Sequence, residues 1–185
     1  MNENSSDKDL VIAFNDGDTS AFRLIVERYQ GRIFVLVGYL VAGSGDMEAV
    51  RDIVQDTFVE FSRFCRAPHD WTRLSVRSEL YRIVLCRSSE RVRSSSREIS
   101  YKNILVALSQ ARQPQKVSDE DAEKIEAIKQ IFEGLQVLER DVREVVVLRE
   151  IAGMSLEEIA ETTSVTKEVV RYRLLQAEGC FTNPR

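Results

Sequence analysis

The chain is poor in the residues from which metal centres and catalytic sites are usually built. Its 185 residues include one histidine, His69, and three cysteines, Cys65, Cys86 and Cys180. The cysteines are odd in number, far apart and without a CxxC spacing, which indicates neither a disulfide framework nor a zinc site. A lone histidine in a proline-containing loop argues against a histidine metal centre, and we expect it to be solvated. We therefore expect no metal and no cofactor.

Long apolar runs are also missing. No run approaches the ~20 residues needed to span a bilayer. The first residues, MNENSSDKDL, lack the basic and apolar regions of a signal peptide. The net charge is −4 and 43% of the residues are hydrophobic, a balance typical of a soluble globular protein. These features predict a cytoplasmic protein without membrane insertion.

Only three prolines and eight glycines occur, and alternation with period two is rare, whereas helical periodicity is frequent. We predict an all-α fold made of two small helical domains joined by a linker. Apolar stripes in the first half predict helices near residues 7–15, 21–40, 50–61 and 76–97. The expected boundaries are residues 1–97 for the first domain, 98–118 for the linker and 119–185 for the second domain.

The most informative segment runs from Leu138 to Ala177. Ser155 precedes the apolar-periodic run LEEIAE and Glu158 follows three residues later, which is the pattern of a capping box at a helix start. A polar run ends that helix, and Thr166 is placed to cap a second helix from Lys167. Two short helices joined by such a turn are typical of a helix-turn-helix, whose second helix enters the DNA major groove. The inward side of the second helix is expected to carry Val169, Val170 and Leu174.

The outward side of that second helix carries side chains that reach phosphates or base edges, namely Lys167, Arg171, Tyr172, Arg173 and Gln176. Glu168, at its start, would face phosphate. Residues 138–178 hold six Lys or Arg against nine Asp or Glu. Because phosphate neutralisation dominates non-specific affinity, we expect this module alone to bind DNA weakly. A plain packing unit of two helices has the same spacing and stays an alternative.

Several segments in a fixed order resemble a bacterial RNA polymerase sigma factor of the extracytoplasmic-function group within the sigma-70 family. DIVQDTF (Asp52 to Phe58) resembles the D-[LI]-V-Q-[ED]-x-F signature of that group. LYRI (Leu80 to Ile83) resembles part of its promoter-facing helix, and Arg143 to Glu161 is similar to its region 4. The resemblance spans about residues 20–177, with the linker unmatched, and implies a region 2-like and a region 4-like domain.

The resemblance implies a role for each matching position. Asp52, Gln55 and Asp56 would dock on the clamp helices of the polymerase β′ subunit, with a solvated helix face as the alternative. Trp71 would stack on a flipped base of the −10 promoter element, or instead plug its loop onto the helical core. The helix from Lys167 would read the −35 element, while the rest of region 4 packs on the β flap. Core RNA polymerase and promoter DNA are thus the implied partners, and an anti-sigma factor is a further one.

Arginines dominate the end of the predicted helix at 76–97. Only Glu90 opposes them along that stretch, and spacings of four and five place several on one side of the helix. Such a basic helix end suits a DNA backbone near the melted element. The arginines expected to contact DNA are Arg82, Arg87, Arg91 and Arg93.

Some positions depart from the family pattern in segments that the resemblance implies bind DNA. Glu79 stands in place of the usual tryptophan before LYRI, and Cys86 in place of an asparagine. Glu139 replaces a proline that opens region 4, Ser164 replaces the turn glycine, and Ser62 replaces a tryptophan. These changes leave the folds intact but bear on promoter opening.

Two main functions compete. We expect a non-enzymatic alternative sigma factor that binds core polymerase and directs initiation at promoters through their −10 and −35 elements. The alternative is a divergent sigma-like regulator that binds polymerase or an anti-sigma factor but opens promoters poorly. A two-domain repressor would need a dimerisation helix beyond those already used. An enzyme is least expected because the sequence has no phosphate loop, metal-ligand cluster or nucleophile paired with a base.

Overall fold

The computed structural model describes residues 5–41, 47–67, 69–70, 75–94, 130–131 and 133–182. Side chains are described as far as residue 91 in the helix that ends at 94, and residue 180 in the helix that ends at 182. Every regular element in these ranges is helical, which confirms the predicted all-α class. None of these helices is long and apolar enough to cross a membrane. The predicted linker, the first residues of the second domain and Trp71 lie outside the described residues.

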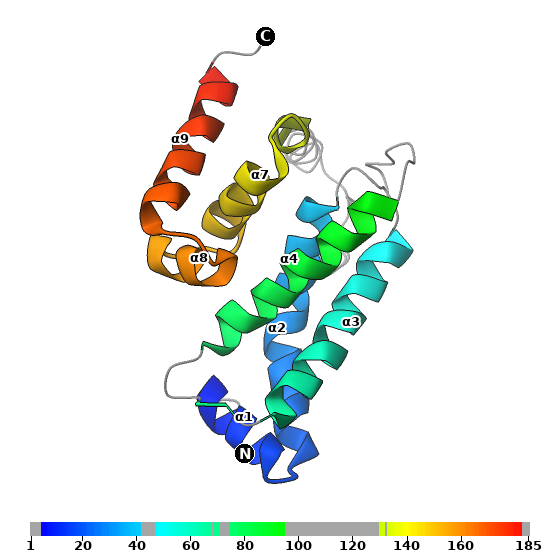
Figure 1. The fold of residues 1–185 in the computed structure, drawn as a ribbon. Coiled ribbons are helices and arrows are strands. Elements are labelled where there is room, and N and C mark those ends of the chain that lie inside the picture. Colours follow the sequence, from blue (N-terminus) through cyan, green and yellow to red (C-terminus); the bar gives the residue numbers. More distant parts are fainter. Residues whose placement is uncertain are drawn as a thin grey trace, which may run out of the picture.

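Four helices form the N-terminal bundle (Figure 1). They are α1 (Asp7–Asn15), α2 (Thr19–Leu40), α3 (Met47–Arg66) and α4 (Val76–Ser94). The bounds of α1 match the predicted helix at 7–15. Side-chain caps explain the first two starts, since Ser6 Oγ accepts a hydrogen bond from the Asp9 amide and Asp18 Oδ1 accepts one from the Ser20 amide.

The apolar stripe predicted for residues 21–40 is the inner face of α2. The buried residues Ala21, Ile25, Tyr29 and Ile33 recur at four-residue spacing, which keeps them on one side of the helix. Residues 36–40 at the end of α2 are all buried. Phe22, Val26 and Phe34 are only half-buried.

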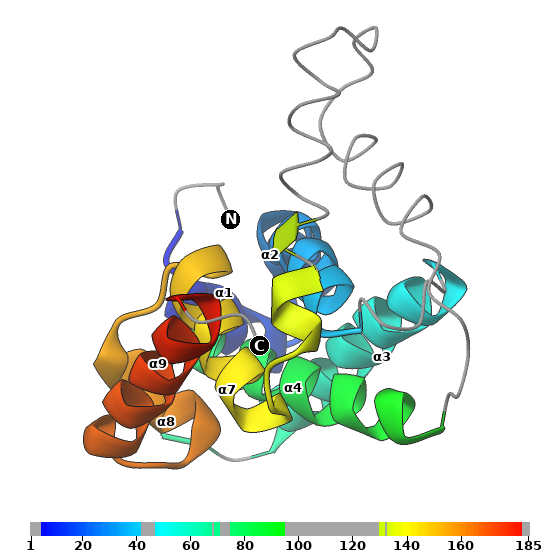
Figure 2. The same ribbon diagram turned by 90° about the horizontal axis from the view of Figure 1, so that it is seen from above.

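The C-terminal group of helices lies beside this bundle (Figures 1 and 2). It contains helical residues 130–131 and 133–136, then α7 (Arg140–Val146), the π-helical turn η1 (Val147–Ile151), α8 (Leu156–Thr163) and α9 (Lys167–Thr182). Helix α7 runs directly into η1, and α9 packs along α7 and α8. The observed α8 and α9 confirm the predicted helix-turn-helix.

One apolar core runs through both groups of helices. The turn η1 packs against α2, and α8 packs against α4. Leu148 in η1 and Met154 before α8 have no exposed surface. The two predicted domains therefore form a closed arrangement rather than two separated units.

Two expectations about exposure are wrong. Val169 is 37% exposed, because Val170, Leu174 and Ala177 occupy the inner face of α9 instead. His69 is half-buried rather than solvated, because its ring stacks on that of Phe64 with centroids 3.9 Å apart.

In the turn between α8 and α9, Ser164 adopts a left-handed conformation, with φ 56° and ψ 38°. The Ser164 amide donates to the Glu161 carbonyl at 3.3 Å, and the Val165 amide donates to the Ala160 carbonyl at 3.1 Å. Glycine adopts this conformation without the clash that a Cβ atom makes with the backbone. The missing turn glycine therefore leaves strain at this position.

We expect Ser164→Gly to raise the free energy of unfolding by about 1 kcal/mol, because it relieves the left-handed strain. Urea unfolding followed by circular dichroism measures the change. Ser164→Ala is the matched control, since it removes the hydroxyl but keeps the Cβ atom, and it should give no gain. Equal stability of the glycine variant and the natural chain would contradict this account of the turn.

Candidate polymerase and nucleic-acid interface

A reciprocal capping box fixes the start of α8, the first helix of the helix-turn-helix. The Ser155 amide donates to Glu158 Oε2 at 2.7 Å, and the Glu158 amide donates to Ser155 Oγ at 3.2 Å. The hydrogen bond from the Ser155 amide lowers the pKa of the Glu158 carboxyl. At the start of α9, the Val169 amide donates to Thr166 Oγ1 at 3.4 Å. Both predicted caps are thus present, and they set the angle at which α9 leaves the turn.

The outer face of α9 is exposed and mixed in character. Arg171 and Gln176 are exposed, and Tyr172 is 61% exposed. The Gln176 side-chain amide donates to the Tyr172 hydroxyl at 3.4 Å, which links two of the predicted DNA-contacting residues. Val169 and Leu175 add exposed apolar surface to this helix. Guanidinium, amide and apolar groups are the kinds of group that read base edges in the major groove.

Two other predicted DNA-contacting residues of α9 are engaged in ion pairs. Arg173 contacts Asp141 of α7 at 2.6 Å, and only 18% of its side chain is exposed. Arg173 therefore lies between α9 and α7, not on the outer face as we expected. Lys167 Nζ lies 3.0 Å from Glu157 Oε1 and lowers the pKa of that carboxyl. Because Glu157 stands on α8, this exposed pair joins the two helices of the motif.

The arginines of α4 are more strongly opposed by acids than the sequence indicates. Arg82 donates from Nε to Glu79 Oε2 at 3.0 Å, and Glu79 itself is buried. Arg87 donates to Glu60 of α3 at 2.7 Å and to Glu90 at 2.9 Å. These hydrogen bonds raise the pKa of both arginines. The expectation that only Glu90 opposes this stretch is therefore wrong.

The side chain of Arg93 lies outside the described residues, as does Trp71. Arg91 is exposed near the end of α4.

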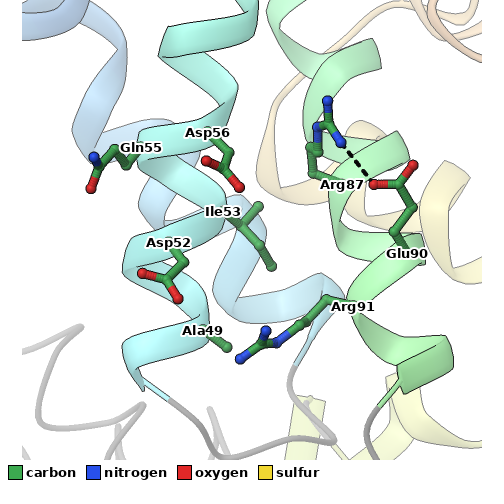
Figure 3. A pocket seen from close by; sticks show the side chains of 8 residues that line it. All are labelled: Ala49, Asp52, Ile53, Gln55, Asp56, Arg87, Glu90 and Arg91. Atoms are coloured by element: carbon green, nitrogen blue, oxygen red, sulfur yellow. Dashed lines mark hydrogen bonds and ion pairs between the residues drawn. The ribbon is translucent and has the colours of Figure 1, made fainter.

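A pocket of about 500 Å³ lies between α3 and α4 (Figure 3). Asp52, Gln55 and Asp56 form its α3 side and are exposed. Arg87, Glu90 and Arg91 line it from α4, with Ala49 and Ile53 between them. The structure thus brings the three predicted polymerase-binding residues together with two predicted DNA-binding arginines in one charged groove.

Sequence reasoning missed three residues that shape these surfaces, Glu60, Arg77 and Asp141. Each pairs with a residue that lies far away in the sequence, at 27, 81 and 32 positions. No local spacing rule finds such pairs, because those rules act within one helix. Among the described residues, no group of three or more histidine, cysteine or acidic side chains is placed to hold a metal ion.

Neutralising Glu79 should release the charge of Arg82 to DNA. We expect Glu79→Gln to raise the affinity for duplex DNA about threefold, and to steepen the dependence of log K on log salt by about one unit. Fluorescence anisotropy across a salt series measures both quantities. Glu27→Gln is the matched control, since Glu27 is exposed on α2 and its removal changes the net charge equally. An equal response of both variants would show that only net charge matters.

Comparison with known proteins agrees with the helix-turn-helix and with the overall fold. Residues 128–179 match the family model "Sigma-70, region 4", which covers the helix-turn-helix. The solved structure of CnrH in complex with the cytosolic domain of CnrY is 24% identical. It superposes with a TM-score of 0.66 over 95% of this chain and 94% of that one, which shows a shared fold.

Curated relatives match nearly the whole chain. The ECF RNA polymerase sigma-E factors of Salmonella typhimurium and Escherichia coli K12 are each 31% identical over 99% of this chain and 96% of their own length. The sigma-E factor of Haemophilus influenzae is 26% identical, over 99% of this chain and 97% of its own. The protein therefore belongs to the extracytoplasmic-function (ECF) sigma factors, which direct transcription by RNA polymerase.

Proposed function

We propose that this sigma factor binds core RNA polymerase and directs initiation at promoters by recognising their −10 and −35 elements. It acts in the cytoplasm and catalyses no reaction of its own. Residues 1–97 form the domain for the −10 element and residues 119–185 the domain for the −35 element, with residues 98–118 as the linker.

The outer face of α9 is the observation that carries this proposal. In a helix-turn-helix the second helix enters the major groove with its outer side chains against the bases. Arginine pairs with guanine, and glutamine with adenine, through two hydrogen bonds each. Arg171, Tyr172 and Gln176 stand exposed on that face and supply these contacts. Lys167 reaches a neighbouring phosphate once it leaves Glu157.

The N-terminal domain binds the −10 element. Arg91 and Arg93 near the end of α4 attract its phosphates. Arg82 and Arg87 do so only in competition with their acidic partners. Trp71 stacks on an unpaired base, a contact worth about 1–3 kcal/mol.

The rim of the α3–α4 pocket is the proposed contact with the clamp helices of the β′ subunit. Asp52, Gln55 and Asp56 present polar groups there without covering the apolar core. Outside the outer face of α9, the C-terminal domain packs on the β flap. CnrH, which shares this fold, forms a complex with the cytosolic domain of CnrY. We propose that an anti-sigma factor is a further partner of this chain and holds it inactive.

A second function has a specific observation in its favour. Arg82, Arg87 and Arg173 are all paired with acids, so the positive charge offered to DNA is smaller than the sequence indicates. A sigma-like regulator that binds polymerase but opens promoters poorly would have such surfaces. Transcription and core binding separate the two functions.

Promoter-directed transcription tests the proposal. Core polymerase with this protein should give discrete transcripts from a pool of genomic fragments, and Arg171→Ala should reduce them about tenfold by removing a base contact. Arg23→Ala, an exposed change on α2, should leave them unchanged. Tight core binding without transcripts from any fragment would favour the regulator instead.

Core binding is tested separately through α3. We expect Asp56→Arg to weaken the affinity for core polymerase about tenfold, because it reverses a charge at the proposed contact. Glu27→Arg, the same reversal on exposed surface of α2, should have little effect, and Arg171→Ala should bind as the natural chain does. Biolayer interferometry with immobilised core polymerase gives these affinities. Unchanged binding by Asp56→Arg would remove the α3 rim from the polymerase contact.

A further inference from the structure

The inner face of α9, which packs on α7 and α8, carries a largely buried charged residue. Val170 and Ala177 are buried on this face, and Leu174 is partly buried beside them. Arg173 lies at the same helical spacing, and only 18% of its side chain is exposed. An inner helix face is ordinarily apolar, so an arginine at this place needs a specific reason. The other charged residues of α9 are exposed, namely Lys167, Glu168, Arg171 and Glu178.

Arg173 reaches a carboxylate on the neighbouring helix. Its Nη2 atom donates to Asp141 Oδ2 at 2.6 Å, a charge-assisted hydrogen bond between residues 32 positions apart. Asp141 lies in the first turn of α7, where the helix dipole favours an acid. Val142 and Val145 of α7 are buried, so the backbone that carries Asp141 is anchored in the core. The carboxylate is therefore a fixed point against which α9 is oriented.

The hydrogen bond from Arg173 supplies a direction that the apolar contacts of α9 lack. Burial of valine and alanine side chains is favourable at several orientations, because the hydrophobic effect is non-directional. A charge-assisted hydrogen bond is favourable only within a narrow range of distance and angle. Successive side chains of an α-helix are about 100° apart around its axis, so a rotation of that size exchanges inner for outer residues. The pair of Arg173 and Asp141 thus selects one rotation of α9.

This rotation decides which side chains of α9 face away from the domain. Arg171, Tyr172 and Gln176 are exposed in the observed orientation, whereas Val170 has no exposed surface. Side chains that form a binding site must be held within about 0.5 Å and 10–20° of the productive geometry. The angle between neighbouring side chains is several times this tolerance. Base recognition by α9 therefore requires a contact that fixes its rotation.

We propose that Arg173 and Asp141 are positioning residues that set the rotation of α9 about its axis and, through it, the base selectivity at the −35 element. This inference rests on the proposed function, since it takes α9 as the helix that reads bases. Arg173 acts through the outer face of α9 and does not contact DNA itself. Lys167 differs, because its pair with Glu157 is exposed at both residues and is able to exchange for a phosphate.

Thiol reactivity in the full chain measures the rotation without DNA or polymerase. Val170 has no exposed surface, so the thiol introduced by Val170→Cys should react slowly with iodoacetamide. Peptide mass spectrometry separates this thiol from the exposed Cys86 and Cys180. Adding Asp141→Ala should raise its reaction rate about tenfold, because α9 then leaves the observed orientation more often. Asp141 is 61% exposed, so this change should not prevent folding.

Glu139→Ala is the matched control for the loss of charge. Glu139 is exposed two residues before Asp141, and its side chain makes no capping hydrogen bond at the start of α7. Its removal should leave the Val170→Cys thiol slow to react, and Asp141→Glu, which keeps the carboxylate, should do the same. Equal reaction rates with Asp141→Ala, with Glu139→Ala and without either change would overturn the positioning role.

Base selectivity is then measured with core polymerase and the full chain. A promoter recovered from the genomic pool is varied one base at a time across its −35 element, and transcripts from parent and variants are compared. Asp141→Ala should lower the preference for the parent base about fivefold at the positions that α9 reads. Asp141→Glu should recover most of the preference, and Glu139→Ala should match the natural chain. Unchanged selectivity in Asp141→Ala would overturn the proposal.

A direct phosphate contact by Arg173 predicts a different result. Asp141→Ala would then release the guanidinium, raise transcription from every −35 variant alike, and steepen the salt dependence of duplex DNA binding by about one unit more than Glu139→Ala does. That outcome would also overturn the positioning role. If the natural chain gives no promoter-specific transcripts, the proposed function fails and the selectivity role fails with it. The reactivity of Val170→Cys then still decides whether the pair orients α9.

Discussion

The burial of α4 on more than one side is the constraint on which the rest of the structure depends. Leu80, Tyr81, Ile83, Val84 and Leu85 are all at most 7% exposed, and they are too close in sequence to share one helix face. A helix with apolar residues on more than one side must be covered on each of those sides. Helices α2 and α3 cover it from within the bundle, and α8 covers it from the other domain. The closed arrangement follows from this one helix.

The same constraint explains how charge is distributed. With most of α4 buried, its polar residues occupy a narrow strip and the helix ends, where arginines and acids meet at close range. Arg82 turns back to Glu79, and Arg87 reaches Glu60 across the groove. These ion pairs hold in place the α4 arginines that we propose contact DNA, and they neutralise part of the charge available to phosphate. Of these four side chains, Arg87 lines the α3–α4 pocket, together with Glu90 and Arg91 of the same helix.

Local sequence rules were sufficient to predict the helices, but they did not predict which surface side chains pair with one another. The bounds of α1, the capping box of Ser155 and Glu158, and the helix-turn-helix all followed from spacings within one or two helices. The family pattern marked Ser164 as a replaced turn glycine, and the structure places it in the left-handed conformation. Arg173 and Val169 were misplaced because the packing of α9 on α7 sets its rotation, and no pattern inside α9 encodes that. The hydrogen bonds from Arg77 to Glu158 and to the Ala152 carbonyl need both domains at once.

Site-specific photocrosslinking in the complete promoter complex tests most directly whether one chain holds polymerase and promoter through these two surfaces. A photoreactive residue at Gln55 reports the α3 rim, and one at Tyr172 reports the outer face of α9. The account predicts that Gln55 crosslinks to the β′ subunit and Tyr172 to duplex DNA in the same complex. Crosslinking of Gln55 to β′ with none from Tyr172 to DNA would contradict it, and would leave a polymerase-binding regulator that does not read the promoter.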